Sequence, residues 1–255
     1  MKALDLVATQ APGSANGSKR GVLPLAAAKP LSKAQGQSLA RLQEAWQSLA
    51  LRLLRDDSLV RPWALGITSA LPQEGRTTSA IGLAIALAKE TKDRVALLEA
   101  DWMNPAIVAG GKTQTAPGLI DYLEERCELE KAFIPTNREN LTLIAAGAMP
   151  AKRPEFSTQD NPAIALRQKM PSIIATLKRH FGYVVVDMPP LLSDVHAGSI
   201  ASLLDASVLV VRAGMTPLGK AREAVRLMDR GNLIGIVHMG VPTAIPRFVS
   251  DLLLE

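Results

Sequence analysis

The sequence predicts an α/β protein with a single doubly wound, mostly parallel sheet, flanked by helices and preceded by a flexible N-terminal arm. Two observations predict this class. Short apolar runs such as 183–186 and 207–211 do not alternate with polar residues, which is typical of strands that helices cover on both faces. Helix-forming stretches separate most of these runs. We therefore expect an arm at residues 1–37 and one domain over residues 38–255.

The predicted arm is rich in Ala, Gly, Ser, Pro, Lys and Gln and has no sustained apolar period. Residues 1–62 hold nine Lys or Arg against four Asp or Glu, so they carry the whole net charge of +5. A basic arm could lie near an acidic membrane surface, but the dispersion of its charges favours a solvated tail. The same dispersion argues against nucleic acid as a partner.

A helix is predicted from Ser38 to Leu54, because apolar residues recur there at helical spacing. We expect this helix to pack on the domain that follows or against a second copy of the chain. The recurring residues are Leu39, Leu42, Trp46, Leu49 and Leu53.

The domain is expected to begin with a strand, a loop and a helix. Residues 63–68 form a short apolar run, residues 69–75 form a loop, and residues 79–89 are rich in helix formers. Ligands of such open sheets bind at the carboxyl ends of the strands, so the residues that follow each strand are candidates for the site. Further strands are predicted from the apolar runs at 94–99, 141–145, 183–187, 206–212 and 233–238.

The loop after the first strand predicts a phosphate-binding site. Its sequence from Ala70 to Thr77 matches the pattern A/G-x-x-x-x-G-K-[ST], except that Arg76 stands in place of the Lys. Backbone N–H groups of such a loop and the positive end of the next helix attract phosphate, and Thr77 would give its hydroxyl to Mg²⁺. A loop that only caps a helix is the alternative. The predicted cofactor-binding residues are Ala70, Gln73, Glu74, Gly75, Arg76, Thr77 and Thr78.

Acidic residues follow two other predicted strands. Asp187 ends the apolar run at 183–187, and Glu99 and Asp101 come at the end of the run at 94–99. A single acid after a strand is usually a helix cap, but several at neighbouring strand ends favour a magnesium site. The predicted metal ligands are therefore Thr77, Asp101 and Asp187.

Several other classes of protein are excluded. A single cysteine, Cys127, excludes a disulfide framework and a cysteine-based zinc site, and the three histidines lie far apart without ligand spacing. No apolar stretch approaches the ~20 residues needed to span a bilayer, and the apolar run at the N-terminus is too short for a signal peptide. We expect a cytoplasmic protein.

With these residues in view, the chain resembles the bacterial cytoplasmic tyrosine kinases of capsule and exopolysaccharide synthesis, within the deviant-Walker P-loop ATPase superfamily. The loop at 69–78 begins with nine residues similar to S-x-x-P-G-E-G-K-[ST], and residues 97–105 are similar to the last nine positions of L-L-I-D-A-D-L-R-R-P. Similar segments lie at 118–123 (G-L-x-D-x-L), 147–155 (G-x-x-P-x-N-P-x-E), 184–192 (V-I-I-D-T-P-P-V-L) and 210–217 (V-V-R-x-x-x-T-P).

The resemblance implies ATP or ADP and Mg²⁺ as cofactors, with Glu99, Asp101 and Arg76 in the catalytic positions. It also implies a membrane polysaccharide chain-length regulator as partner, which would hold the protein at the inner face of the cytoplasmic membrane. A homo-oligomer is possible in this family, but the assembly motif E-x-x-R-x-x-R appears here as Glu44, Gln47 and Ala50, without its arginines.

Several positions depart from the family pattern. Arg76 replaces a lysine, Gln73 replaces a loop glycine, and Glu99 replaces an aspartate, moving its carboxylate outward by about one methylene. Neither tyrosine, Tyr122 or Tyr183, falls in a tail that could accept phosphate. The departures favour a regulatory protein, a pseudokinase with weakened or lost nucleotide chemistry. The alternatives are an active Mg-ATP-dependent tyrosine kinase or ATPase that acts on another protein and, more weakly, a partition-type positioning ATPase.

Overall fold

A seven-stranded sheet with the strand order β3-β4-β2-β5-β1-β6-β7 forms the centre of the protein. The structure, a computed structural model, describes residues 33–107, 117–147, 162–228 and 233–240. The strands are β1 (Trp63–Ser69), β2 (Val95–Glu99), β3 (Phe133–Pro135), β4 (Leu141–Ile144), β5 (Tyr183–Asp187), β6 (Ala206–Arg212) and β7 (Leu233–Met239). The helices are α1 (Lys33–Leu54), α2 (Arg76–Glu90), α3 (Leu119–Leu123), η1 (Leu129–Ala132), α4 (Pro162–His180), α5 (Ala197–Ala201) and α6 (Leu218–Leu227).

The sheet is parallel except at one edge, so the predicted fold class is confirmed. The exception is β3, which pairs antiparallel with β4 and which the sequence did not predict. Its three residues are too few to show a hydrophobic period, and they are only partly covered. Pro135, which cannot donate a ladder hydrogen bond, is tolerated there because β3 is an edge strand.

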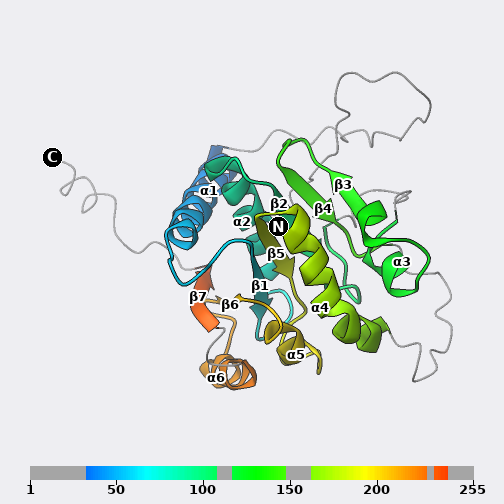
Figure 1. Ribbon diagram of the computed structural model, residues 1–255. Coiled ribbons are helices and arrows are strands. Elements are labelled where there is room, and N and C mark those ends of the chain that lie inside the picture. Colours follow the sequence, from blue (N-terminus) through cyan, green and yellow to red (C-terminus); the bar gives the residue numbers. More distant parts are fainter. Residues whose placement is uncertain (1–32, 108–116, 148–161, 229–232, 241–255) are drawn as a thin grey trace, which may run out of the picture.

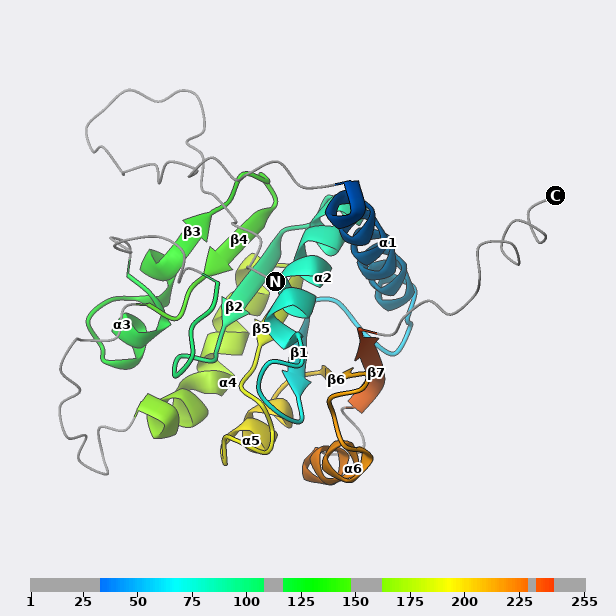
Figure 2. The same cartoon turned by 180° about the vertical axis from the view of Figure 1, so that it is seen from behind.

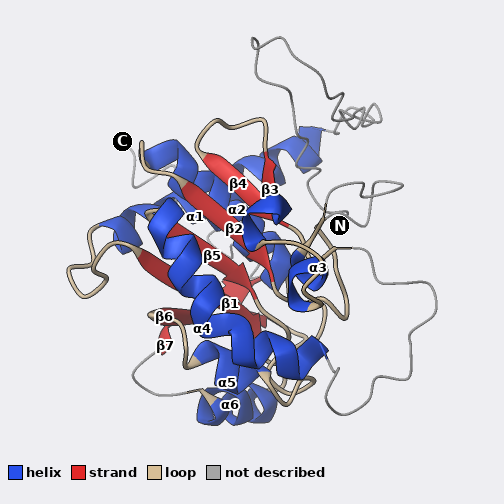
Figure 3. Cartoon of the chain, turned by 45° about the vertical axis from the view of Figure 1, so that its right-hand side comes forward, coloured by secondary structure: helices blue, strands red, loops and turns tan. Residues whose placement is uncertain are grey.

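Helices cover both faces of the sheet (Figure 1, Figure 3). Seen from behind, α1 and α2 lie over one face, whereas α4 and α5 lie over the other (Figure 2). Successive strand residues therefore enter different clusters: Val184 packs with the α4 side and Val185 with the α2 side. This two-sided burial is the reason that the central strands read as unbroken apolar runs.

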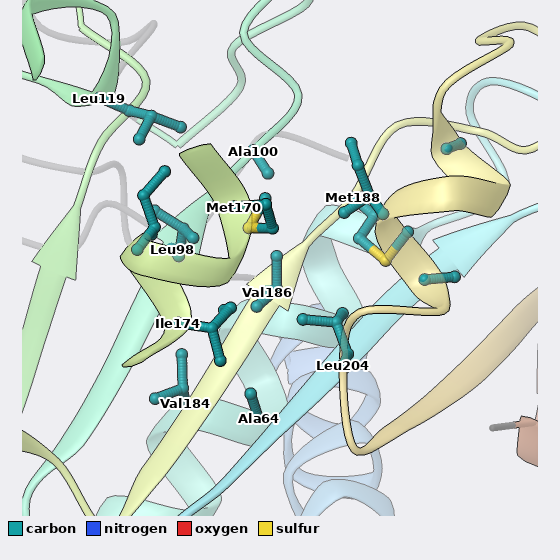
Figure 4. Close-up of a cluster of buried hydrophobic side chains, with 14 of the residues drawn as sticks. Ala64, Leu98, Ala100, Leu119, Met170, Ile174, Val184, Val186, Met188 and Leu204 are labelled. Carbon is teal, nitrogen blue, oxygen red and sulfur yellow. The ribbon is translucent and has the colours of Figure 1, made fainter. Parts of the chain in front are cut away.

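The core on the α4 side is drawn in close-up in Figure 4. There Met170 and Ile174 of α4 lie against Val184 and Val186 of β5, while Leu204 closes the cluster beside α5. All five side chains are buried. This packing fixes the end of β5, where Asp187 follows directly after Val186.

The N-terminal helix α1 packs on α2 of the same chain, which is the first of the two expectations for it. Trp46 and Ala50 are buried against α2, and Gly82 gives the indole room, since an added Cβ would lie 2.5 Å from Trp46 Nε1. Gln47 Nε2 donates to Glu90 Oε1 at 2.6 Å. Gln47 and Ala50 are therefore both engaged in contacts within the chain.

The boundary between the predicted arm and the first helix differs from the prediction. The helix begins at Lys33 rather than Ser38, so the last residues of the predicted arm are helical. Residues 1–32 lie outside the described part of the chain, as do 148–155 of one family segment and the C-terminal residues 241–255. Within the described ranges, no helix is both long and apolar enough to cross a membrane.

Candidate nucleotide site

The loop between β1 and α2 has the backbone shape of a phosphate cradle. Gly75, immediately before the first turn of α2, has φ 97°, and Gln73 has φ 64°, so both hold the left-handed conformation. The first turn of α2, with Thr77 and Thr78, follows at once, and its N–H groups attract anions. Gln73 adopts this backbone despite its side chain, at a cost of about 1–2 kcal/mol relative to glycine.

Side chains from a distant segment tie this loop in place. Glu74 is 3% exposed, and its Oε2 accepts the Leu71 N–H at 2.9 Å. Its Oε1 accepts the hydroxyl of Thr216, and Arg212 Nη1 donates to the Gln73 carbonyl at 3.1 Å. The sequence flagged residues 210–217 only as a family segment and assigned no role to Arg212 or Thr216. Arg212 and Thr216 reach the loop because β6, which ends at Arg212, pairs with β1 in the sheet.

The carboxylates meet because the strands that carry them are neighbours. Asp187 at the end of β5 is in register with Glu99 of β2 and with Ile67 of β1. Asp101 follows β2 by two residues. These ends lie at the edge of the sheet from which the loop to α2 leaves (Figure 2). The structure thus brings together the loop, Thr77, Glu99, Asp101 and Asp187, as the strand-end reasoning expected.

Arg76 lies between two of these carboxylates rather than free in the loop. Its guanidinium forms an ion pair with Asp101, and its Nε lies 3.6 Å from Asp187 Oδ1. The side chains of Arg76, Asp101 and Asp187 are 11%, 3% and 1% exposed. Among the described residues, Arg76 Nε and Asp187 Oδ1 have no hydrogen-bond partner, so each faces the other without a closer contact.

Burial changes the titration of both acids. It raises the pKa of Asp187 to about 7, an effect that the nearby Glu99 and Asp101 reinforce and that Arg76 and a Thr77 hydrogen bond oppose. Burial also raises the pKa of Asp101, against the charge of Arg76 and hydrogen bonds from Asn104. The backbone N–H of Asn104 donates to Asp101 Oδ1 at 3.2 Å. Arg76 therefore stabilises the ionised form of both carboxylates.

Glu99, predicted as catalytic, has both oxygens occupied by backbone donors. Its Oε1 accepts the N–H groups of Ala106 and Ile107, each at 2.7 Å, and its Oε2 accepts the Ala146 N–H at 3.0 Å. The side chain is 1% exposed. In this arrangement Glu99 fastens the segments after β2 and β4 to the sheet.

Mg²⁺ fits this site by donor chemistry but not by arrangement. Thr77, Asp101 and Asp187 offer the oxygen atoms that Mg²⁺ prefers. However, the guanidinium of Arg76 is ion-paired with Asp101, and its Nε lies 3.6 Å from Asp187 Oδ1, so a cation of the chain already stands between the two carboxylates. No group of three or more acidic, His or Cys residues suited to a metal occurs in the described ranges. A dication would have to displace or crowd Arg76.

The doubly wound sheet and the loop with its strand-end acids define the class of protein, a P-loop nucleotide-binding fold. A family model for an AAA domain matches residues 74–216. The chain belongs to the bacterial tyrosine kinase family, to which several of its curated relatives belong.

Two of these relatives are tyrosine-protein kinases. YwqD of Bacillus subtilis (strain 168) is 30% identical over 178 residues, covering 68% of this chain and 70% of its own length. CpsD of Streptococcus pneumoniae serotype 4 is 30% identical over 179 residues, covering 68% of this chain and 74% of its own. The succinoglycan biosynthesis transport protein ExoP of Rhizobium meliloti is 30% identical over 177 residues, which are 69% of this chain but 21% of that protein.

Solved structures share the fold. The kinase domain of VpsO superposes with a TM-score of 0.69 at 24% identity, covering 82% of this chain and 98% of that chain. The septum site-determining protein MinD of Pyrococcus horikoshii, complexed with Mg-ADP, gives a TM-score of 0.58 at 20% identity and covers 74% of this chain and 76% of that chain. The fold is therefore one in which Mg-nucleotide complexes are known.

Proposed function

We propose that this chain is a regulatory member of its family, which binds ATP or ADP at the phosphate loop and has weakened or lost phosphoryl-transfer chemistry. The observation that carries the proposal is the ion pairing of Arg76 with both Asp101 and Asp187. In its relatives' pattern a lysine stands at this position, and a compact ammonium and a planar guanidinium do not occupy the same space.

The shape of the loop supports nucleotide binding. Gly75 has a left-handed backbone conformation, and hydrogen bonds of Glu74, Arg212 and Thr216 hold the neighbouring loop residues in place. The loop therefore needs little further ordering when phosphate binds. The expected contacts come from the backbone of residues 70–76 and from Thr77 and Thr78 at the N-terminus of α2.

Weak chemistry follows from the placement of the charged groups. Phosphoryl transfer depends almost wholly on positioning and on neutralising phosphate charge, which Mg²⁺ supplies when it is bound. Here Asp101 and Asp187 are paired with Arg76, and both oxygens of Glu99 bind backbone N–H groups. The residues in the catalytic positions are therefore engaged with one another and with the backbone.

The proposed role is to modulate exopolysaccharide polymerisation or export, together with a membrane chain-length regulator at the inner face of the cytoplasmic membrane. The similarity to ExoP, named for succinoglycan biosynthesis and transport, supports the link to polysaccharide. Action through such a partner is favoured over self-assembly, because Ala50 is buried against α2 and Gln47 binds Glu90 within the chain.

Calorimetric titration with ADP and ATP tests nucleotide binding. Two glycine variants test whether that binding depends on the backbone of the loop. In Gly75→Ala the new Cβ would meet a φ of 97° and Met239 Cε at 3.3 Å, so we expect at least about a tenfold loss of affinity, equivalent to 1.4 kcal/mol. Gly214→Ala is the matched control, because Gly214 has φ 73° with nothing within 4 Å of an added Cβ. Equal affinity in wild type and Gly75→Ala, or no binding by the wild type, would refute this part.

An active kinase that phosphorylates another protein is the second candidate. It is favoured by the proximity of Thr77, Asp101 and Asp187, three oxygen donors that the family also uses. Incubation with Mg-ATP and cell extract, read by phosphotyrosine detection, separates the two functions. A signal that Thr77→Ala and Asp187→Ala abolish would establish the kinase and end the regulatory proposal.

A further inference from the structure

The guanidinium of Arg76 is enclosed with two acidic side chains that water barely reaches. Asp101 and Asp187 are 3% and 1% exposed, and Arg76 is 11% exposed. Burying two carboxylates is costly unless a cation accompanies them. Among the described residues, Arg76 is the one basic side chain whose charge favours the ionised forms of both acids. The site is thus assembled around a cation that belongs to the chain.

The position of this cation coincides with the place that a divalent ion would need. The oxygens of Asp101 and Asp187 are the carboxylate donors of the site, and both face Arg76. An arginine side chain stays protonated at every accessible pH, so it cannot make room by losing its charge. A dication added beside it would place three positive charges against two negative ones, in surroundings that screen them weakly.

We propose that Arg76 is a resident cation that replaces the divalent metal at Asp101 and Asp187, so that the site is assembled, and takes up nucleotide phosphate, without Mg²⁺. The second half of this inference rests on the proposed function. The first half concerns the protein alone and can be tested without nucleotide.

Thermal unfolding with and without MgCl₂ tests the resident cation. We expect Mg²⁺ to shift the wild-type Tm by less than about 1 °C. In Arg76→Met the two acids lose their cation, the Tm falls, and Mg²⁺ at ~100 times its Kd should restore about 5 °C or more. In Arg76→Met combined with Asp187→Asn this gain should disappear, because one carboxylate of the pair is gone.

Arg126→Met is the matched control. Arg126 also pairs with two carboxylates, those of Asp121 and Glu124, but its side chain is 50% exposed. Mg²⁺ should not raise the Tm of this variant beyond the wild-type shift. An equal gain in Arg126→Met and Arg76→Met, or no gain in Arg76→Met, overturns the proposal.

Binding of Mn²⁺ to the wild type, read by electron paramagnetic resonance, keeps the test decisive if Arg76→Met does not fold. We expect Mn²⁺ at ~1 mM to remain free, and one bound Mn²⁺ that Asp187→Asn removes overturns the proposal. ADP titration in EDTA and in MgCl₂ then tests the second half. Equal affinities support it, and a tenfold gain with Mg²⁺ overturns it. Absence of ADP binding in both buffers refutes the proposed function and the second half, while the Tm and Mn²⁺ results still decide the first.

Discussion

Replacing Glu99 by glutamine should destabilise the protein although it changes only one oxygen to an amide nitrogen. The buried carboxylate accepts three backbone N–H groups, those of Ala106, Ile107 and Ala146. An amide has one acceptor oxygen, so its NH₂ group must face at least one of these donors. That donor then loses its partner inside the protein.

The magnitude follows from these contacts. One unpaired buried donor costs about 1–3 kcal/mol, and the two remaining bonds lose about 1 kcal/mol each when the acceptor is no longer charged. Relief from burying a charge offsets part of this sum. We therefore expect Glu99→Gln to lower the free energy of unfolding by about 2–4 kcal/mol, which lowers the Tm by about 5–15 °C.

Urea unfolding followed by circular dichroism measures this loss. The matched control is Glu139→Gln at an exposed position, where we expect a change within about 0.5 kcal/mol. If Glu99→Gln is as stable as Glu139→Gln, the carboxylate does not fasten these segments, and the reasoning from its hydrogen bonds is wrong. A catalytic role for Glu99 would then regain support.

Three further predictions concern other elements. Gly82→Ala should lower the free energy of unfolding, measured in urea, by about 1–3 kcal/mol, because the new Cβ would lie 2.5 Å from Trp46 Nε1. This loss should exceed the gain from the better helix propensity of alanine. A stabilised variant would contradict the packing of α1 on α2. Gln73→Gly should raise the free energy of unfolding by about 0.5–1 kcal/mol, because the relief of backbone strain at φ 64° exceeds the cost of the added entropy of the unfolded chain. A loss of stability in the same assay would count against this reasoning. The pKa of Asp187 is raised from 3.8 to about 7, so the native state holds a proton that the unfolded state releases, and the free energy of unfolding should fall as pH rises from about 4 to about 7. Asp187→Asn should flatten this dependence, and identical pH profiles for variant and wild type would show that another group is responsible.

Much of the fold could be predicted from local patterns. Strands such as 183–187 are buried on both faces, and this two-sided burial appears in the sequence as an unbroken apolar run. The edge strand at 133–135 was not predicted, because three partly covered residues are too few to show a hydrophobic period. The start of α1 was misplaced because the prediction rested on the periodic apolar residues, which begin only at Leu39, several residues after the helix starts at Lys33.

The candidate site was predictable as a set of residues but not as an arrangement. Parallel strands bring their carboxyl ends to one edge, so the grouping of Thr77, Asp101 and Asp187 followed from the strand assignments. Arg212 and Thr216 had no such signal, because their contacts with the loop bridge more than a hundred residues of sequence.

By itself, the sequence determined the class of fold, the candidate phosphate loop and the family, because these depend on hydrophobic period and on short motifs that the chain carries locally. Only the tertiary structure decided what the charged side chains do. Arg76 turns to Asp101 and Asp187, and Glu99 binds three backbone N–H groups, because burial at the meeting of β1, β2 and β5 removes water and forces each charge to find a partner inside the protein.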